Sequence, residues 1–146
     1  MAPSTDPNLF DHGRLAREVL VENPVLYQKI AASCNLERDA VPGILCELMR
    51  FLNLAAHSRC ILTPSRAIDD AWHEFILCTR SYSEFCTRYF GRMIHHHPGG
   101  KAQTNRDQFQ QTLAIYRDHF GDPDERFWLS PRVLETDVAD CGGCET

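Results

Sequence analysis

The chain of 146 residues carries 15 lysines and arginines against 20 aspartates and glutamates, which gives a net charge of −5. A chain of this length buries about two-thirds of its unfolded surface in a single domain. The acidic balance argues against non-specific nucleic-acid binding, because a basic surface supplies most of that affinity. Since no apolar run is long enough to span a membrane and the N-terminus does not resemble a signal peptide, we expect a soluble, cytoplasmic protein.

The first part of the chain carries start signals for two short helices and the pattern of a longer one. Asp6 and Pro7 are typical of the cap and first position of a helix, and Asn23 and Pro24 repeat this signal. Residues 41–58 are apolar on nearly every side of a helix. We therefore predict that this third segment is the central core helix, buried on most of its surface.

Helical signals continue after residue 60. Thr63 and Pro64 again form a cap and a first position, and Ser81 with Glu84 has the spacing of a capping box that restarts a helix. The histidine triplet before Pro98 is predicted to lie in a loop, because the proline and the paired glycines after it end any helix.

The last predicted elements are one long helix and one helical turn. Either Thr104 or Asn105 caps the long helix, and Gly121 is a signal for its C-terminal end. One more helical turn follows, started by Asp122, Pro123 and Glu125, and it is predicted to bury Phe127 and Trp128.

The whole pattern predicts an all-α protein, since no segment alternates over the length of a strand. We expect a single-domain bundle of about five to six helices over residues 1–133. Apolar periodicity stops there, so residues 134–146 are predicted to form a flexible, acidic, cysteine-containing tail.

The most informative side chains for function lie on the helix predicted to begin at Pro64. Asp69 and His73 are four residues apart, so they leave the same side of a helix one turn from each other. They flank an apolar stripe centred near Trp72, where a ligand at the edge of a core would lie. Asp70 also lies one turn from His73 and is an alternative carboxylate. Spacing alone does not choose between the two acids.

The triplet His95, His96 and His97 supplies a second group of ligands. One of these histidines together with His73 and an aspartate would suit zinc, iron(II) or manganese(II), with open positions for water or substrate. Cys86 is a further candidate that would favour zinc, although a cysteine on an apolar face is more often an inert buried thiol. The alternative interpretation is an ordinary ion pair on a helix, worth about 0.3 kcal/mol, beside a histidine-containing loop.

The sequence therefore gives metal binding as the leading functional hypothesis. If the site is catalytic, the metal would act on bound water or on dioxygen, because the chain offers no serine triad and no glycine-rich phosphate loop. Trp72, Tyr82 and Tyr89 would then wall the pocket, although they are equally well explained as core aromatics.

The tail contains a Cys141-Gly-Gly-Cys144 motif. No helix follows to lower the pKa of the first thiol, so a redox-catalytic motif is not favoured. A flexible metal-capturing pair, or a segment that another protein recognises or modifies, fits better. The remaining thiols are expected to be buried and reduced, and they include Cys34, Cys46, Cys60 and Cys78.

A rival hypothesis is a metal-free protein-interaction module. Residues 80–106 hold five basic residues and one glutamate, a net charge of +4. This basic 80–106 face would dock an acidic or phosphorylated partner, and the CGGC tail would be an attachment point.

Several segments resemble the glycine-rich domain-containing protein family, whose better-known members are plant proteins. They are MRFLNLAA, TPSRAIDDAWHEFILCTRSYSEFC, FGRMIHHHP and YRDHFGDPDERFW, and the likeness covers residues 46–128. The most specific part is Asp69-x-x-Trp72-His73, followed by Tyr82, Gly91 and a histidine best matched by His96. The resemblance implies a helical module and the same three candidate ligands, without a reaction.

The chain also departs from that family in ways that limit what is carried over. Phe75 stands where the plant members carry a second histidine. Their long glycine-rich extension is replaced by the short acidic tail, so the interaction and RNA-related roles of that extension are not implied here.

Overall fold

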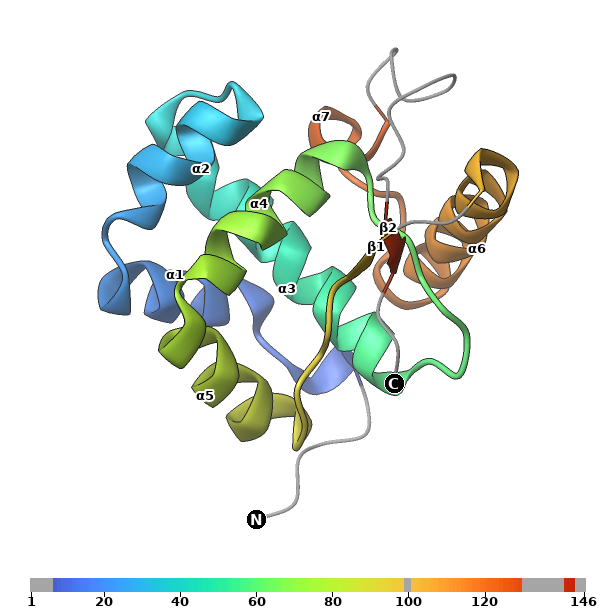
Figure 1. The fold of residues 1–146 in the computed structure, drawn as a ribbon, viewed down its shortest axis with the longest axis horizontal. Helices are drawn as coiled ribbons and strands as arrows, with labels where there is room; N and C mark the ends of the chain where they lie inside the picture. The colour runs from blue at the N-terminus through green and yellow to red at the C-terminus, as the bar shows by residue number, and fades with distance from the viewer. Residues whose placement is uncertain (1–6, 99–100, 130–140, 144–146) are drawn as a thin grey trace.

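The computed structural model describes residues 7–98, 101–129 and 141–143. Within these ranges the chain forms six helices of nine or more residues and a four-residue α7. The longest apolar helix, α3 (Val41–His57), crosses the middle of the molecule (Figure 1). The predicted all-α class is confirmed. None of the helices in the described part is long and apolar enough to cross a membrane.

The other elements are arranged around α3. Figure 1 places α1, α2 and α5 on one side of the molecule and α6 on the other, with α4 lying across α3. Their bounds are η1 (Pro7–Leu9), α1 (His12–Glu22), α2 (Leu26–Cys34), η2 (Arg38–Ala40), α4 (Arg66–Leu77), α5 (Thr79–Phe90), β1 (His97–Pro98), α6 (Ala102–Phe120), α7 (Glu125–Trp128) and β2 (Cys141–Gly143).

The core is built on α3, as its nearly continuous apolar sequence predicts. Ile44, Leu45, Leu48 and Phe51 are fully buried. At Gly43 the short helix α7 comes so close that a Cβ atom would lie 3.3 Å from the ring of Phe127. A side chain at this position would therefore require the Phe127 ring to move by a few tenths of an ångström.

A buried acid on α3 holds the C-terminal helices in place. Glu47 is 5% exposed, and its Oε1 accepts hydrogen bonds from the hydroxyl of Tyr116 at 2.5 Å and from the indole of Trp128 at 2.8 Å. Arg50 donates to its Oε2 at 3.0 Å. The pKa of the Tyr116 hydroxyl is raised, mainly by burial and to a smaller extent by the neighbouring Glu47. A buried charge persists only when it is paired and hydrogen-bonded, and Glu47 meets this condition through α6 and α7.

The predicted starts of the first two helices are displaced. Asp6 lies outside the described residues, and Pro7 begins the 3-10 turn η1. Helix α1 begins at His12, because the side chain of Asp11 accepts the backbone N–H of Arg14 at 3.0 Å and caps the helix. Helix α2 begins at Leu26, after the Asn-Pro signal.

Helix α4 begins two residues later than Thr63 and Pro64 predict. Ser65 is the cap, and its hydroxyl accepts from the N–H of Ile68 at 3.2 Å while donating to the carbonyl of Phe127 at 2.6 Å. Thr63 instead donates its N–H to Thr112 on α6 at 3.0 Å. Contacts with α6 and α7, which are distant in the sequence, therefore fix where α4 starts. Local sequence signals cannot predict such contacts.

The starts of α5 and α6 were also predicted too late. Helix α5 begins at Thr79, and Ser81 is occupied by a hydrogen bond from the side chain of Asn23, 2.7 Å away. Helix α6 begins at Ala102 rather than after Thr104 or Asn105. The end predicted at Gly121 is confirmed, with φ at +81°, a conformation that favours glycine.

The predicted loop around the histidine triplet contains a two-residue strand. His97–Pro98 pairs antiparallel with Cys141–Gly143, with His97 opposite Gly143 and Pro98 opposite Cys141. Most of the predicted flexible tail, and the domain boundary predicted at residue 133, lie outside the described residues. The described part of the tail lies beside the segment that follows His96.

We predict that Glu47→Ala lowers the free energy of unfolding by about 3–5 kcal/mol, because it leaves buried donors and Arg50 without their acceptor. Urea unfolding followed by tryptophan fluorescence measures this loss. The control is Glu18→Ala, which removes a half-exposed carboxylate bonded to Tyr89 and should cost less than about 1 kcal/mol. Equal losses in the two variants would contradict the role given to Glu47.

A second prediction concerns pH. Burial, and then the charge of Arg50, lowers the pKa of His12 from 6.5 to about 4, and its Nε2 faces the amide nitrogen of Asn53 at 2.8 Å. Between pH 6.5 and pH 4, His12 is therefore protonated in the unfolded chain but not in the folded one. The free energy of unfolding should therefore fall by up to about 3 kcal/mol as the pH drops from 6.5 to 4. His12→Gln keeps an acceptor for Asn53 and should flatten this slope; an unchanged slope would contradict the assignment.

Candidate metal centre

Three predicted ligands from two separate segments meet at one point. Asp69 and His73 lie one turn apart on α4, and His96 lies in the segment that follows α5. The Nε2 atom of His96 is 2.6 Å from Oδ1 of Asp69, and Nδ1 of His73 is 3.6 Å from Oδ2. One ligand atom from each of the three side chains lies within 4.8 Å of the others. No other group of this kind occurs among the residues that the structure describes.

The spacing of these atoms is close to that of a metal site. An ion bound at about 2.1 Å from each ligand keeps the ligands about 3–4 Å apart. The 2.6 Å between His96 Nε2 and Asp69 Oδ1 is shorter than this range, so that distance would lengthen when an ion binds. The 3.6 Å between His73 Nδ1 and Asp69 Oδ2 already lies within it.

The site is buried on one side and open on the other. The side chain of Asp69 is 8% exposed and that of His96 15%, whereas that of His73 is 51% exposed. A small molecule can therefore approach from the His73 side. An ion held there by three protein ligands would keep coordination positions that face solvent.

Aromatic packing supports the inner side. The ring of His96 lies between the rings of Trp72 and His73, with centroids 4.4 and 4.3 Å away. Trp72 is fully buried and donates its indole N–H to the hydroxyl of Tyr82 at 3.0 Å. Trp72 and Tyr82 are therefore core aromatics that also back the candidate site.

Tyr89, the third predicted wall of the pocket, is directed elsewhere. Its hydroxyl donates to Oε2 of Glu18 on α1 at 2.7 Å, and its ring packs against Phe10 and Phe85. The structure does not bring it to the three candidate ligands. The sequence places Tyr82 and Tyr89 on the same face of the predicted helix, so it could not show that only Tyr82 lies near the site.

The alternative histidines lie outside the cluster. His95 is exposed, and the backbone of His97 belongs to β1. Their rings are 6.3 Å from each other. The middle member of the triplet is thus the one that turns toward α4, and neither neighbour joins the group of three.

Asp70, the alternative carboxylate, faces a different part of the surface. It lines a hollow of about 310 Å³ together with Ser33, His73 and Glu74. Burial, and then the charge of Asp69, raises the pKa of Asp70. Asp69 is therefore the carboxylate that meets both imidazoles, and the hollow adjoins the site through His73.

Cys86 is not in the cluster either. Its side chain is fully buried, and burial raises the pKa of its thiol, an effect that the nearby Ile94 backbone and Tyr82 hydroxyl only partly offset. Cys86 is therefore a neutral, buried thiol and not a metal ligand of this cluster. Of the tail thiols, Cys141 begins β2, and Cys144 lies outside the described residues.

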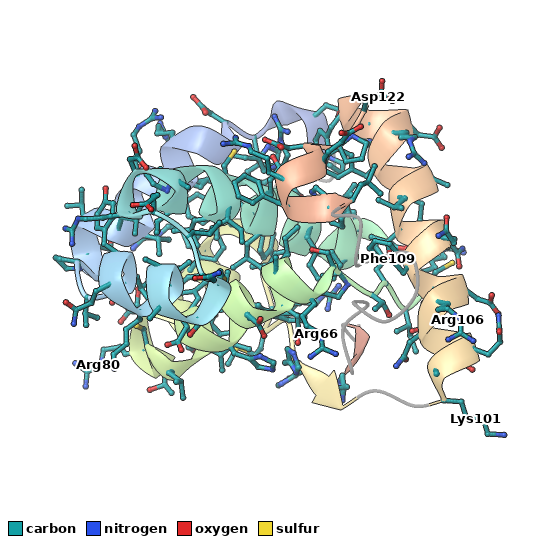
Figure 2. All side chains as sticks on the ribbon, turned by 90° about the horizontal axis from the view of Figure 1, so that it is seen from above. Arg66, Arg80, Lys101, Arg106, Phe109 and Asp122 are labelled. Atoms are coloured by element: carbon teal, nitrogen blue, oxygen red, sulfur yellow. The ribbon has the colours of Figure 1, made fainter. Side chains whose placement is uncertain are left out.

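The basic residues of the 80–106 segment are spread over the molecule. Figure 2 places Arg80 at the opposite end from Lys101 and Arg106. Arg92 donates to the carbonyl of Ala56 at 2.7 Å and is thereby tied to α3. The docking of a partner on this segment stays a prediction.

Together these observations define a small helical protein with a candidate histidine and aspartate metal centre. A family model described as UCP032817-like matches residues 19–118, a range that includes all three candidate ligands. The chain belongs to this family, whose function is not established. No curated protein and no solved structure matches the chain.

The resemblance to the glycine-rich domain-containing protein family was wrong, because the matching family is a different one. The motif that carried it, Asp69-x-x-Trp72-His73, is a pattern of helical geometry. A helix that buries a tryptophan and presents an acid and a histidine one turn apart readily gives this spacing. Such a short pattern does not identify a family.

We predict that thiol reactivity follows the exposure of each cysteine. Cys60 is exposed, whereas burial raises the pKa of Cys34 to about 12 and that of Cys86 above its usual range. Alkylation of the native protein at neutral pH should modify Cys60 well before Cys34 and Cys86, because the thiolate is the reactive form. Peptide mass spectrometry after short exposure to iodoacetamide measures the order, and early labelling of Cys86 would contradict it.

Proposed function

We propose that this protein binds a divalent transition-metal ion, zinc, iron(II) or manganese(II), through Asp69, His73 and His96. The observation that supports this most directly is the convergence of the three ligand atoms within 4.8 Å. They come from a helix and from a separate segment, so helix spacing alone does not account for their meeting. Two imidazoles and one carboxylate are a ligand set that these ions accept.

The electrostatics of the cluster favour a cation. Asp69 is a buried carboxylate, its side chain 8% exposed, next to two imidazole rings. Removing a charge from water is costly unless opposite charge compensates it. A divalent ion bound by the carboxylate and both imidazoles would supply such charge.

The position of the three ligands also suits a reactive metal. When bound, the ion would act as a Lewis acid on water or would bind dioxygen. Asp69 and His96 would hold it against the core from the buried side, and Trp72 would exclude water there. His73 would hold it at the solvent edge, beside the polar hollow lined by Ser33, Asp70 and Glu74.

The alternative function, a metal-free module that binds an acidic or phosphorylated partner, has less support. Arg80 lies at the opposite end of the molecule from Lys101 and Arg106 in Figure 2, which does not favour a single docking face. This alternative stays a prediction.

Metal content tests the proposal. Protein purified without a histidine tag, loaded with Zn²⁺ and desalted, should hold about one ion per chain. His73→Ala and His96→Ala should lose it, since each removes one of only three ligands. The matched control is His95→Ala, which removes an exposed imidazole next to His96 and should retain the ion.

The other hypotheses give different results in the same assay. If the tail captures the metal, deletion of residues 141–146 abolishes binding and the α4 substitutions do not. If the protein is a metal-free module, the original chain holds no ion. Circular dichroism of each variant shows whether a lost ion reflects a lost ligand or a lost fold.

A further inference from the structure

His96 is the one candidate ligand that no helix holds. Helix α5 ends at Phe90, with Gly91 in the left-handed conformation at φ +76°. The chain then runs back to α4 over a few residues before β1 begins at His97. Whatever fixes this segment also fixes the distance between the His96 imidazole and Asp69.

The segment is held at Ile94, two residues before the ligand. Ile94 is fully buried, and its carbonyl accepts a hydrogen bond from the hydroxyl of Tyr82. The buried thiol of Cys86, one turn further along α5, lies close to the Ile94 backbone. The hydroxyl of Tyr82 thus holds one residue of the following segment, and Cys86 is next to it.

The same hydroxyl is connected to the other side of the site. Tyr82 accepts the indole N–H of Trp72 at 3.0 Å, and the Trp72 ring lies 4.4 Å from the ring of His96. Tyr82 is 2% exposed and packs edge-on against Phe75 of α4 at 5.0 Å. The hydroxyl therefore joins α4, α5 and the His96 segment at one buried point.

We propose that Tyr82 is a positioning residue for the metal site, assisted by Cys86. Its hydroxyl fixes Ile94, and through it the place of the His96 imidazole relative to Asp69 and His73. This inference rests on the proposed metal function. It assigns control of affinity and coordination geometry to a group that does not touch the ion.

The energetic basis is the burial of both hydrogen-bond partners. Removal of the hydroxyl takes away the hydrogen-bond partner of the buried Trp72 N–H and of the buried Ile94 carbonyl. Buried polar groups are costly to leave unpaired. The segment can then shift so that the Ile94 carbonyl finds another donor, which moves His96 away from Asp69. Partners that orient a metal ligand typically change metal affinity by about 10–100-fold when they are removed.

The test compares Tyr82→Phe with Tyr89→Phe. Both tyrosines lie on α5 and both hydroxyls donate one hydrogen bond, but that of Tyr89 goes to Glu18 on α1. Zn²⁺ affinity is measured by competition with a coloured chelator, and the visible absorption spectrum of bound Co²⁺ reports coordination geometry. Unfolding without metal shows how much stability each substitution removes.

Tyr82→Phe should bind Zn²⁺ about 10–100-fold more weakly and change the Co²⁺ spectrum, whereas Tyr89→Phe should change neither. A Tyr82→Phe chain with the original affinity and spectrum overturns the inference and leaves the proposed metal function standing. An original chain that binds neither ion overturns both. If Tyr82→Phe does not fold, Cys86→Ala decides the matter: weakened binding supports the positioning role, and unchanged binding overturns it.

Discussion

The contact between Asp69 and His96 is the constraint on which the candidate site depends. A carboxylate that is 8% exposed lies 2.6 Å from an imidazole supplied by a different segment of the chain. Burying such a group is unfavourable unless opposite charge or strong hydrogen bonds compensate it. The pairing therefore constrains the segment after α5, and it brings His96 next to His73. The same compensation is what a bound divalent ion would provide more completely.

Other buried polar contacts carry this constraint back to the core. Glu47 on α3 holds Trp128 of α7, and the carbonyl of the adjacent Phe127 accepts the hydroxyl of Ser65, the cap of α4. The N–H of Asp69 in turn donates to the carbonyl of Ser65 at 2.9 Å. The position of the carboxylate along α4 is thus tied to the central helix by hydrogen bonds at each step. Buried networks of this kind, when fully satisfied, specify one arrangement of the elements.

The sequence predicted elements better than it predicted their contacts. The central helix was recognisable because residues 41–58 are mostly apolar, and the end of α6 because glycine is a common signal just after a helix. The start of α4 was missed because Ser65 is selected by the distant Phe127 carbonyl. For the site, helical spacing gave Asp69 and His73. The choice of Asp69 over Asp70, and of His96 within the triplet, depends on how the segment after α5 turns. Nothing in the sequence indicated that Ile94 holds this turn.

The most direct measurement of the central claim is an anomalous scattering map from crystals of the metal-loaded protein, recorded at the absorption edge of the bound ion. The account predicts one peak within about 2.0–2.2 Å of Nδ1 of His73, Nε2 of His96 and an oxygen of Asp69. A peak at His95, at His97 or at the CGGC tail, or no peak between α4 and the segment after α5, would contradict it.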